Sequence, residues 1–265
     1  MELVSVIMAV YNGAATIEAA IHSVQQQSYP QWELLVCDDG STDETERLVA
    51  GLQDPRVRWL PGIPSGRPAV PRNRGIRAAA GKWLAILDQD DEWLPDKLAI
   101  QMEQVRQKPY LAWCANARRL FPGQGIVGNM MGIPRKTVEF ADLLNMNPIV
   151  TSSILFHRSL LDSVAGFPEN MALMGIDDYA LWLRMACCTP IGVVFEPQLI
   201  YRDDAGHSAR SLVVRNYWQE RQAVFGDLLQ WSAGKPSEKI PPSCLAAARR
   251  VYWQAQRELD DIAQD

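Results

Sequence analysis

Residues Trp83–Asp91 read WLAILDQDD, an unbroken apolar run of strand length that ends in three carboxylates within four residues. Such a run predicts a buried strand of a parallel sheet, and α/β proteins bind ligands outside the carboxyl ends of these strands. Crowded carboxylates repel one another unless a cation compensates, and their hard oxygen atoms suit Mg²⁺ or Mn²⁺. The structural alternative is an acidic turn before the helix that begins near Pro95–Leu98.

The segments before this stretch alternate between strand-like and helix-like patterns. Strands are predicted over 3–10, 33–37 and 56–60, and helices around Ile17, Ile21 and Val24 and over 70–80. This alternation predicts a parallel sheet with helices on its faces. A second acidic loop, Asp38–Glu44, follows the second strand, and Ser41 and Glu44 have the spacing of a capping box. Both acidic loops are therefore expected at one edge of the sheet, in a crevice of the kind that holds nucleotides.

The sequence lacks two common phosphate-binding loops. It contains no Gly-x-x-x-x-Gly-Lys-Ser/Thr, and no Gly-x-Gly-x-x-Gly follows the first strand. A nucleotide would then be held by the acids themselves. One carboxylate can accept the imide N–H of uracil, another can accept ribose hydroxyls, and a divalent cation can bridge a third to the diphosphate. Arg72, near the start of its helix, adds a positive charge for the phosphate or base.

Composition sets the outer limits. With 265 residues, 48% of them hydrophobic and 22% charged, the chain fits one large α/β domain or one domain plus an appendage. A net charge of -5 disfavours a protein whose main partner is nucleic acid. The apolar run Leu3–Val10 is too short to span a bilayer and lacks a basic flank, so the cytoplasm is the expected location. The five cysteines include no Cys-x-x-Cys pair, so neither a zinc site nor a disulfide framework is expected.

Five motifs, in this order along the chain, resemble those of family 2 glycosyltransferases of the GT-A fold. They are Val4–Asn12 (VSVIMAVYN), Asp38–Asp43 (DDGSTD), Arg72–Ile76 (RNRGI), Leu87–Asp91 (LDQDD) and Asp177–Arg184 (DDYALWLR). The resemblance covers about residues 3–202 and implies an α/β fold with a single Rossmann-like, mostly parallel sheet flanked by helices. It also implies an inverting, metal-dependent enzyme that moves a sugar from a nucleotide-sugar, expected to be a UDP-sugar. The acceptor would be a saccharide or lipid-linked saccharide in cell-surface polysaccharide synthesis.

The resemblance further implies roles for individual residues. The nucleotide would be bound by Ala9, Val10, Tyr11, Asp39, Arg72 and Asp90. Asp91 would be the main metal ligand, with Asp90 beside it and Mn²⁺ or Mg²⁺ as cofactor. Asp178 would be the catalytic base, because it matches the second residue of the family's Glu-Asp pair. Such a base must reach the acceptor hydroxyl on the face of the sugar opposite the leaving diphosphate. The alternative for Asp178 and its neighbour Asp177 is stabilisation by a helix dipole.

Weaker expectations concern the acceptor side and the end of the catalytic domain. Thr151 and Ser152 could donate to sugar hydroxyls, with Asp177 nearby, and the segment 121–132 is expected to be a mobile loop and a candidate lid. The family often has a His shortly after a Tyr-Arg pair in this region. Here Asp204 stands at that place and His207 follows, so either residue or neither completes the metal shell.

The sequence suggests a catalytic domain over 1–212 and a C-terminal helical extension over 213–265. The nucleotide-sugar half would span about 1–115 and the acceptor half 116–212. Within the extension, helices are predicted over 213–231 and 242–263. Arg249 and Arg250 lie near aromatic residues and could touch an anionic membrane surface, as a peripheral contact at its inner face, or a lipid-linked acceptor. Packing on the catalytic domain or on a second subunit of a homodimer is the more ordinary alternative, and no transmembrane segment is predicted.

Two other functions stay open at this point. A non-catalytic nucleotide-sugar binding or scaffold subunit would share the fold, although the intact Asp91 and Asp178 argue against it. A sugar nucleotidyltransferase of similar fold would carry a glycine-rich, basic loop after the first strand, where Asn12–Ala15 stands instead. A retaining glycosidase ranks lower, because its two carboxylates need no nucleotide pocket.

Overall fold

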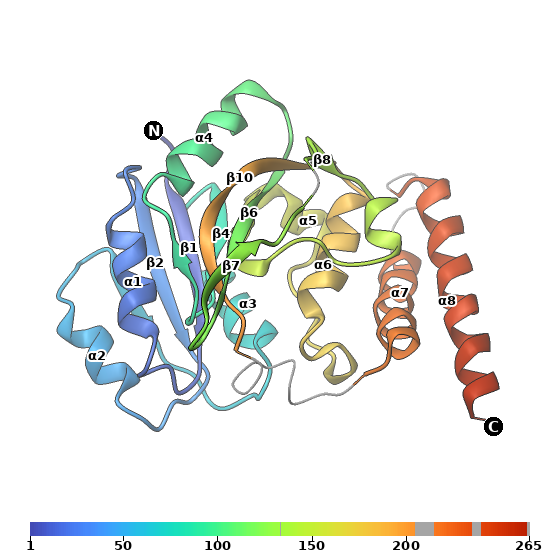
Figure 1. Ribbon diagram of the computed structural model, residues 1–265, viewed down its shortest axis with the longest axis horizontal. Helices are drawn as coiled ribbons and strands as arrows, with labels where there is room; N and C mark the ends of the chain where they lie inside the picture. Colours follow the sequence, from blue (N-terminus) through green and yellow to red (C-terminus); the bar gives the residue numbers. More distant parts are fainter. Residues whose placement is uncertain (133, 205–214, 235–239, 264–265) are drawn as a thin grey trace.

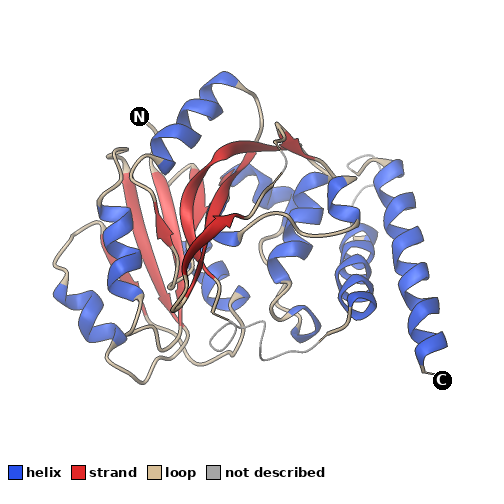
Figure 2. Ribbon diagram, in the orientation of Figure 1, coloured by secondary structure: helices blue, strands red, loops and turns tan. Residues whose placement is uncertain are grey.

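The computed structural model describes residues 1–132, 134–204, 215–234 and 240–263. Its main feature is one sheet with strand order β3-β2-β1-β4-β9-β6-β10-β5, onto which helices pack (Figure 1). A helical pair, α7 and α8, lies at one side of the molecule, away from the first strands (Figure 2). The expectation of a Rossmann-like α/β fold with C-terminal helices is confirmed.

The first half of the sheet is parallel, as predicted. Its strands are β3 (Val57–Leu60), β2 (Trp32–Asp38), β1 (Val4–Val10) and β4 (Trp83–Ile86). The helices between them are α1 (Ile17–Gln25), α2 (Thr45–Gly51) and α3 (Ala69–Ala78). Val10 pairs with Asp38 and Ile7 pairs with Ile86, both in parallel, so the chain leaves β1, β2 and β4 at the same edge of the sheet. The two acidic loops therefore leave the sheet on the side that the sequence predicted.

The second half of the sheet is mixed. Its strands are β5 (Glu92–Trp93), β6 (Ala112–Phe121), β7 (Gly125–Asn129), β8 (Thr137–Val138), β9 (Leu155–His157) and β10 (Ile191–Arg202). β9 lies antiparallel between β4 and β6, whereas β10 runs parallel to β6. The short β9 thus joins the two halves into one sheet.

The segment 121–132 differs from the predicted loop. β6 and β7 form an antiparallel hairpin in which Phe121 pairs with Gly125. Gly123 and Gly125, with φ angles of 81° and 83°, make the turn in a conformation that favours glycine. After β7, Met131 is tied to β6, because its amide N–H donates to the side chain of Asn116 at 2.8 Å.

Two apolar cores cover the two faces of the sheet because successive residues of a strand point to opposite sides. In β1, Ile7 belongs to one core while Val6 and Met8 belong to the other.

The remaining helices are α4 (Lys97–Gln107), α5 (Leu161–Val164), α6 (Asp177–Ala186), α7 (Tyr217–Ala233) and α8 (Pro242–Ile262). Short 3-10 turns are η1 (Asp142–Leu144), η2 (Thr151–Ser153), η3 (Arg158–Leu160) and η4 (Met171–Leu173).

The C-terminal helices pack on the catalytic part of the chain through α7. Arg184 of α6 forms a buried ion pair with Asp227 of α7 at 2.8 Å, and α8 packs on the other side of α7. Figure 1 shows the resulting order α6, α7, α8 toward the edge of the molecule. No helix in the described parts of the chain is long and apolar enough to cross a bilayer. The domain division at residue 212 stays a prediction.

Candidate active site

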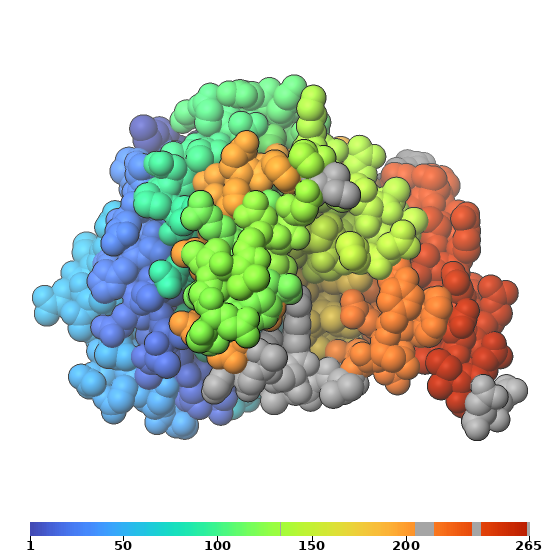
Figure 3. All heavy atoms as spheres, viewed as in Figure 1, coloured from blue at the N-terminus to red at the C-terminus, as the bar shows by residue number. Residues whose placement is uncertain are grey.

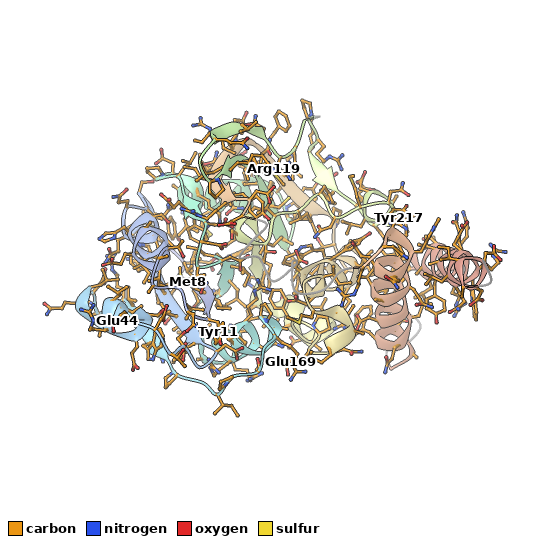
Figure 4. All side chains as sticks on the ribbon, turned by 60° about the horizontal axis from the view of Figure 1, so that its bottom comes forward. Met8, Tyr11, Glu44, Arg119, Glu169 and Tyr217 are labelled. Carbon is orange, nitrogen blue, oxygen red and sulfur yellow. The ribbon has the colours of Figure 1, made fainter. Side chains whose placement is uncertain are left out.

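A cavity of about 770 Å³ opens at the carboxyl ends of β1, β2 and β4. Its lining contains nine of the predicted site residues, namely Ala9, Val10, Tyr11, Asp39, Arg72, Asp90, Thr151, Asp177 and Asp178. Two others, Asp91 and Ser152, are absent from the lining. His207 lies outside the described residues. The fold thus brings motifs from both halves of the sheet into one cavity, with Tyr11 exposed beyond the end of β1 (Figure 4).

The loop after β1 is fixed by the loop after β2. The amide N–H of Asn12 donates to the Ser41 hydroxyl at 2.9 Å, and the Asn12 side chain accepts from the amide of Thr42 at 2.8 Å. Asn12 has a φ of 48°, a conformation that asparagine tolerates better than most residues. Ser41 is therefore not the capping residue that its spacing suggested. α2 begins at Thr45, and the residue at its N-cap, Glu44, makes no side-chain cap.

Asp39 is buried and anchors a loop that the sequence patterns did not assign to the site. Its carboxylate accepts from the amide and the hydroxyl of Ser65, at 3.0 and 2.7 Å, and from the amide of Gly66 at 2.9 Å. A carboxylate offers about four acceptor positions, so one remains for a further donor. Gly66 has a φ of 68°, and the glycine- and proline-rich composition of this loop was the available signal.

The acidic loop after β4 is joined to β1 by its one uncharged member. Gln89 accepts from the amide of Tyr11 at 2.9 Å and donates to the Tyr11 carbonyl at 3.2 Å. A Cβ atom on Gly13 would lie 2.8 Å from the Gln89 side-chain oxygen, so a larger residue there would displace Gln89. The next residue, Asp90, lines the cavity. Its burial, and then the nearby Asp88 carboxylate, raise the pKa of Asp90 to about 6.

Asp91 does not fit the role of main metal ligand. It is 1% exposed, its Oδ2 accepts from the Ser152 hydroxyl at 2.5 Å, and its Oδ1 accepts from the amide of Arg202 at 2.9 Å. Burial, reinforced by the neighbouring acids, raises the pKa of Asp91. Both carboxylate oxygens thus accept from protein donors and none of the residue lines the cavity. We therefore revise this expectation: Asp91 anchors the acidic loop, and Asp90 presents its carboxylate to the cavity.

Ser152 also has a different place from the one expected. It is fully buried, and its hydroxyl accepts from the amide of Asp88 at 3.0 Å while donating to Asp91. Its side chain therefore cannot contact an acceptor sugar. It ties η2 to the acidic loop.

Arg72 connects the two acidic motifs. Its Nη2 donates to Asp88 at 2.7 Å and its Nη1 donates to Asp177 at 2.9 Å, while the guanidinium lies 5.2 Å from the centre of the Phe167 ring. The side chain is buried, so these pairs are poorly screened by water. Burial raises the pKa of Asp177 to about 6, although Arg72 opposes this shift. Asp177 is thus an ion-pair partner of Arg72 at the start of α6.

Asp178 is held by side chains from an irregular segment distant in sequence. Its Oδ2 accepts from the Thr151 hydroxyl at 2.9 Å and from the Asn147 side-chain amide at 3.2 Å. Its Oδ1 accepts from the amide of Tyr179 at 2.7 Å. Asn147 was not recognised from the sequence, because a lone Asn before a proline carries no motif. These contacts orient the carboxylate at the wall of the cavity.

The donor set at the cavity is suited to a divalent cation that binds together with a phosphorylated ligand. Among the described residues, no three His, Cys, Asp or Glu side chains are arranged to hold a metal ion on their own. Mg²⁺ usually takes only one or two carboxylates and completes its shell with water and substrate phosphates. Asp88 and Asp90 supply such carboxylates, and of these two only Asp88 is paired with Arg72. The residues present therefore fit the group that the sequence led us to expect.

The chain is similar in sequence to known proteins. The model of the family described as "Glycosyl transferase family 2" matches residues 5–164. The chain is 34% identical over 183 residues to the UDP-Glc:alpha-D-GlcNAc-diphosphoundecaprenol beta-1,3-glucosyltransferase WfgD of Escherichia coli, covering 69% of each chain. It is 39% identical over 108 residues to the putative teichuronic acid biosynthesis glycosyltransferase TuaG of Bacillus subtilis, covering 40% of this chain and 43% of TuaG.

Solved structures share the fold at low sequence identity. S. aureus TarS 1-349 in complex with UDP-GlcNAc superposes with a TM-score of 0.73 at 19% identity, covering 95% of this chain and 73% of the TarS 1-349 chain. The mannosyltransferase PcManGT from Pyrobaculum calidifontis, in complex with GDP-Man and Mn²⁺, gives a TM-score of 0.59 at 22% identity and covers 99% and 75%. At these identities the likeness concerns the fold alone.

Proposed function

Because the chain belongs to glycosyl transferase family 2, we propose that it transfers a sugar, with inversion, from a UDP-sugar to a saccharide or lipid-linked saccharide. The single observation that carries this proposal is the shared cavity: the strand-end acids and Asp178 line the same space. A donor bound at one wall would thus face a base at the other. The acceptor is expected to be a lipid-linked saccharide of cell-surface polysaccharide assembly, since the name of WfgD describes transfer to a diphosphoundecaprenol-linked sugar.

The donor side would bind the nucleotide through the ends of β1 and β2. Asp39 would accept the imide N–H of the base with its remaining acceptor position, beside the backbone of Ala9 and Val10. Tyr11, exposed at the rim, is in reach of a base or ribose. Arg72 would act on the nucleotide mainly through Asp88, whose position it fixes.

Asp90 and Asp88 would hold Mn²⁺ or Mg²⁺ together with the diphosphate. When bound, the ion supplies positive charge that offsets the charge developing on the departing nucleoside diphosphate. Asp91 and Ser152 would not contact the ion, and would instead fix the backbone of the loop that carries Asp90. His207 remains a candidate ligand for this shell.

The transfer itself would depend on Asp178. Its carboxylate would accept the proton of the acceptor hydroxyl as the oxygen attacks the anomeric carbon, and the bond to the diphosphate would break on the opposite face. Thr151 and Asn147 would orient the base before the acceptor arrives. No covalent intermediate is needed, because a single displacement inverts the configuration.

Calorimetric titration with UDP, GDP, dTDP and CDP tests the donor site, each with Mn²⁺ and with EDTA. UDP should bind in the presence of Mn²⁺ and bind weakly in EDTA. A panel of UDP-sugars, assayed for release of UDP, then names the sugar. Tight, metal-independent binding of another nucleotide would contradict the proposed donor, and no binding at all would contradict the site.

A further inference from the structure

One face of α8 carries a cluster of positive charge around an exposed tryptophan. Arg249, Arg250, Trp253 and Arg257 are all exposed, and Trp253 is 59% exposed. On a helix of 3.6 residues per turn, positions separated by three, four, seven and eight lie on one side, so these four residues form a single stripe. We call this stripe, from Arg249 to Arg257, the basic face of α8. It is about 12 Å long at the helical rise.

The opposite side of α8 explains why this face is free. Ala248 and Ala255 are fully buried, and Val251 and Tyr252 pack against the core that α7 helps to form. Gly226 of α7 approaches Tyr252 so closely that a Cβ there would lie 3.2 Å from its ring. The helix is thus anchored by one side, and Figure 3 shows it as the outermost ridge at that end of the molecule.

The charge on this face is local and opposes the charge of the whole chain. The protein has a net charge of -5, yet no acidic residue lies between Pro242 and Arg257. Among the ion pairs within the described parts of the chain, none involves an arginine of the basic face. Glu258, the next residue along the helix, is half-buried, and the exposed acids that follow it, Asp260 and Asp261, lie in the last turn of the helix.

We propose that the basic face of α8 docks on the surface of an anionic lipid bilayer. Arginine side chains would meet the lipid phosphates, and Trp253 would enter the headgroup region, where an amphipathic ring is favoured. Tyr252 packs edge-to-face against Trp253, with ring centres 5.3 Å apart, which limits the orientations of the exposed ring. The docking itself does not depend on the transfer reaction.

Cosedimentation of the full chain with vesicles tests this proposal. Vesicles of phosphatidylcholine alone and of an equal mixture with phosphatidylglycerol are compared, without any substrate. The protein should bind only the anionic vesicles, and high salt should release it. Each basic side chain near such a surface contributes about fivefold in partition, so Arg249→Gln/Arg250→Gln/Arg257→Gln should lower binding by roughly a hundredfold. Trp253→Ser should lower it by a smaller factor.

A matched variant controls for net charge. Arg47, Arg77 and Arg106 are exposed on α2, α3 and α4, so Arg47→Gln/Arg77→Gln/Arg106→Gln removes the same charge elsewhere. This variant should bind vesicles like the wild type. Equal loss in both triple variants, absence of binding, or equal binding to both vesicle types would overturn the proposal. The proposal would also be overturned if light scattering showed a wild-type dimer that only the α8 substitutions dissociate, while the wild type bound no vesicles.

The vesicle result is separable from the proposed transfer activity. Circular dichroism shows whether the variants fold, and transfer to a water-soluble saccharide should be unchanged by the α8 substitutions. If the wild type binds anionic vesicles but transfers no sugar, the docking proposal stands and the proposed function does not. If it transfers sugar to a soluble acceptor but binds no vesicles, the proposed function stands and the docking proposal is overturned.

Discussion

The two walls of the cavity are built in different ways. On the donor wall, Asp39, Asp88 and Asp90 follow parallel strands, so the order of strands brings their loops to one edge of the sheet. On the acceptor wall, Asp178 begins a helix and is held by Asn147 and Thr151, which lie 31 and 27 residues away in sequence. The donor wall therefore depends on the backbone and the acceptor wall on contacts between side chains. Substitutions should separate the two.

Asp178→Asn is expected to give the largest difference between the effect on sugar transfer and the effect on nucleotide binding. The amide cannot take a proton from the acceptor hydroxyl, so we expect sugar transfer to fall by roughly 10³-fold, within the range for loss of a general base. Binding of UDP with Mn²⁺ should stay near the wild-type value, because the donor wall is untouched. Initial rates of transfer and calorimetry measure the two effects. If nucleotide binding fell as far as transfer, the two walls would not be independent.

Arg72→Gln tests the ion pairs that join the walls. Removing one member of a buried pair leaves charges uncompensated, which costs about 3–5 kcal/mol. We expect the free energy of unfolding to drop by that amount at neutral pH, measured by urea denaturation. Arg77→Gln is the matched control, since Arg77 is exposed on the same helix. An equal loss in the control would mean that α3, and not the ion pairs, is being weakened.

The pH dependence of this loss has a definite sign. Burial raises the folded-state pKa of Asp177 to about 6, above the usual value for aspartate, so the folded protein holds this proton more tightly than the unfolded chain. The contribution to stability is then complete below the unfolded pKa and is lost as the pH rises through about 6. In Arg72→Gln the pKa of Asp177 should rise further. We therefore expect the destabilisation by this substitution to be smaller at pH 5 than at pH 7.5.

The sequence predicted the donor wall better than the acceptor wall for a physical reason. An apolar run followed by acids identifies a strand end, and parallel strands place their ends at one edge. The same sequence pattern does not show which of the carboxylates becomes buried in the fold. Asp90 and Asp91 are adjacent and chemically identical in the chain, yet one lines the cavity and the other accepts from Ser152 and Arg202. Those partners come from η2 and β10, which only the fold brings near.

The comparison of Asp90→Asn with Asp91→Asn tests that revision. Asp90→Asn should weaken Mn²⁺-dependent UDP binding by roughly 10²-fold, because a carboxylate is lost from the cation site. Asp91→Asn should leave more of that binding but lower stability by about 1–3 kcal/mol, because an amide cannot accept from both of its present donors. Calorimetry and thermal unfolding give the two readouts. The reverse pattern would restore Asp91 as the main ligand.

The contacts that hold Asp178 on the acceptor wall escaped prediction from the sequence, because the residues that make them lack a pattern. Thr151 and Ser152 were both expected on the acceptor side. Thr151 lines the cavity and donates its hydroxyl to Asp178, whereas the buried Ser152 donates to Asp91. Thr151 and Ser152 are neighbours in η2, yet their side chains contact different acidic motifs. The loop Ser65–Gly66 was missed similarly, since it reaches Asp39 through two backbone amides and one serine hydroxyl, and none of these makes a recognisable motif.

The smallest expected effect comes from Thr151→Val, which removes one hydrogen bond to the base while keeping the shape of the side chain. The hydroxyl is 2.9 Å from Asp178 Oδ2, and Asn147 remains as a second donor, so the carboxylate should stay in place but be less well oriented. A hydrogen bond to a charged group contributes about 1.5–3 kcal/mol, and we expect a fall of roughly tenfold or somewhat more in kcat. The KM for the donor should not change, because Thr151 makes its contact on the acceptor wall.

Thr151→Ser keeps the hydroxyl and should restore most of the rate. A donor KM that rises with Val, or a Ser variant as slow as Val, would show that η2 shapes the cavity as a whole, so that the two walls are coupled through its backbone and not only through side chains.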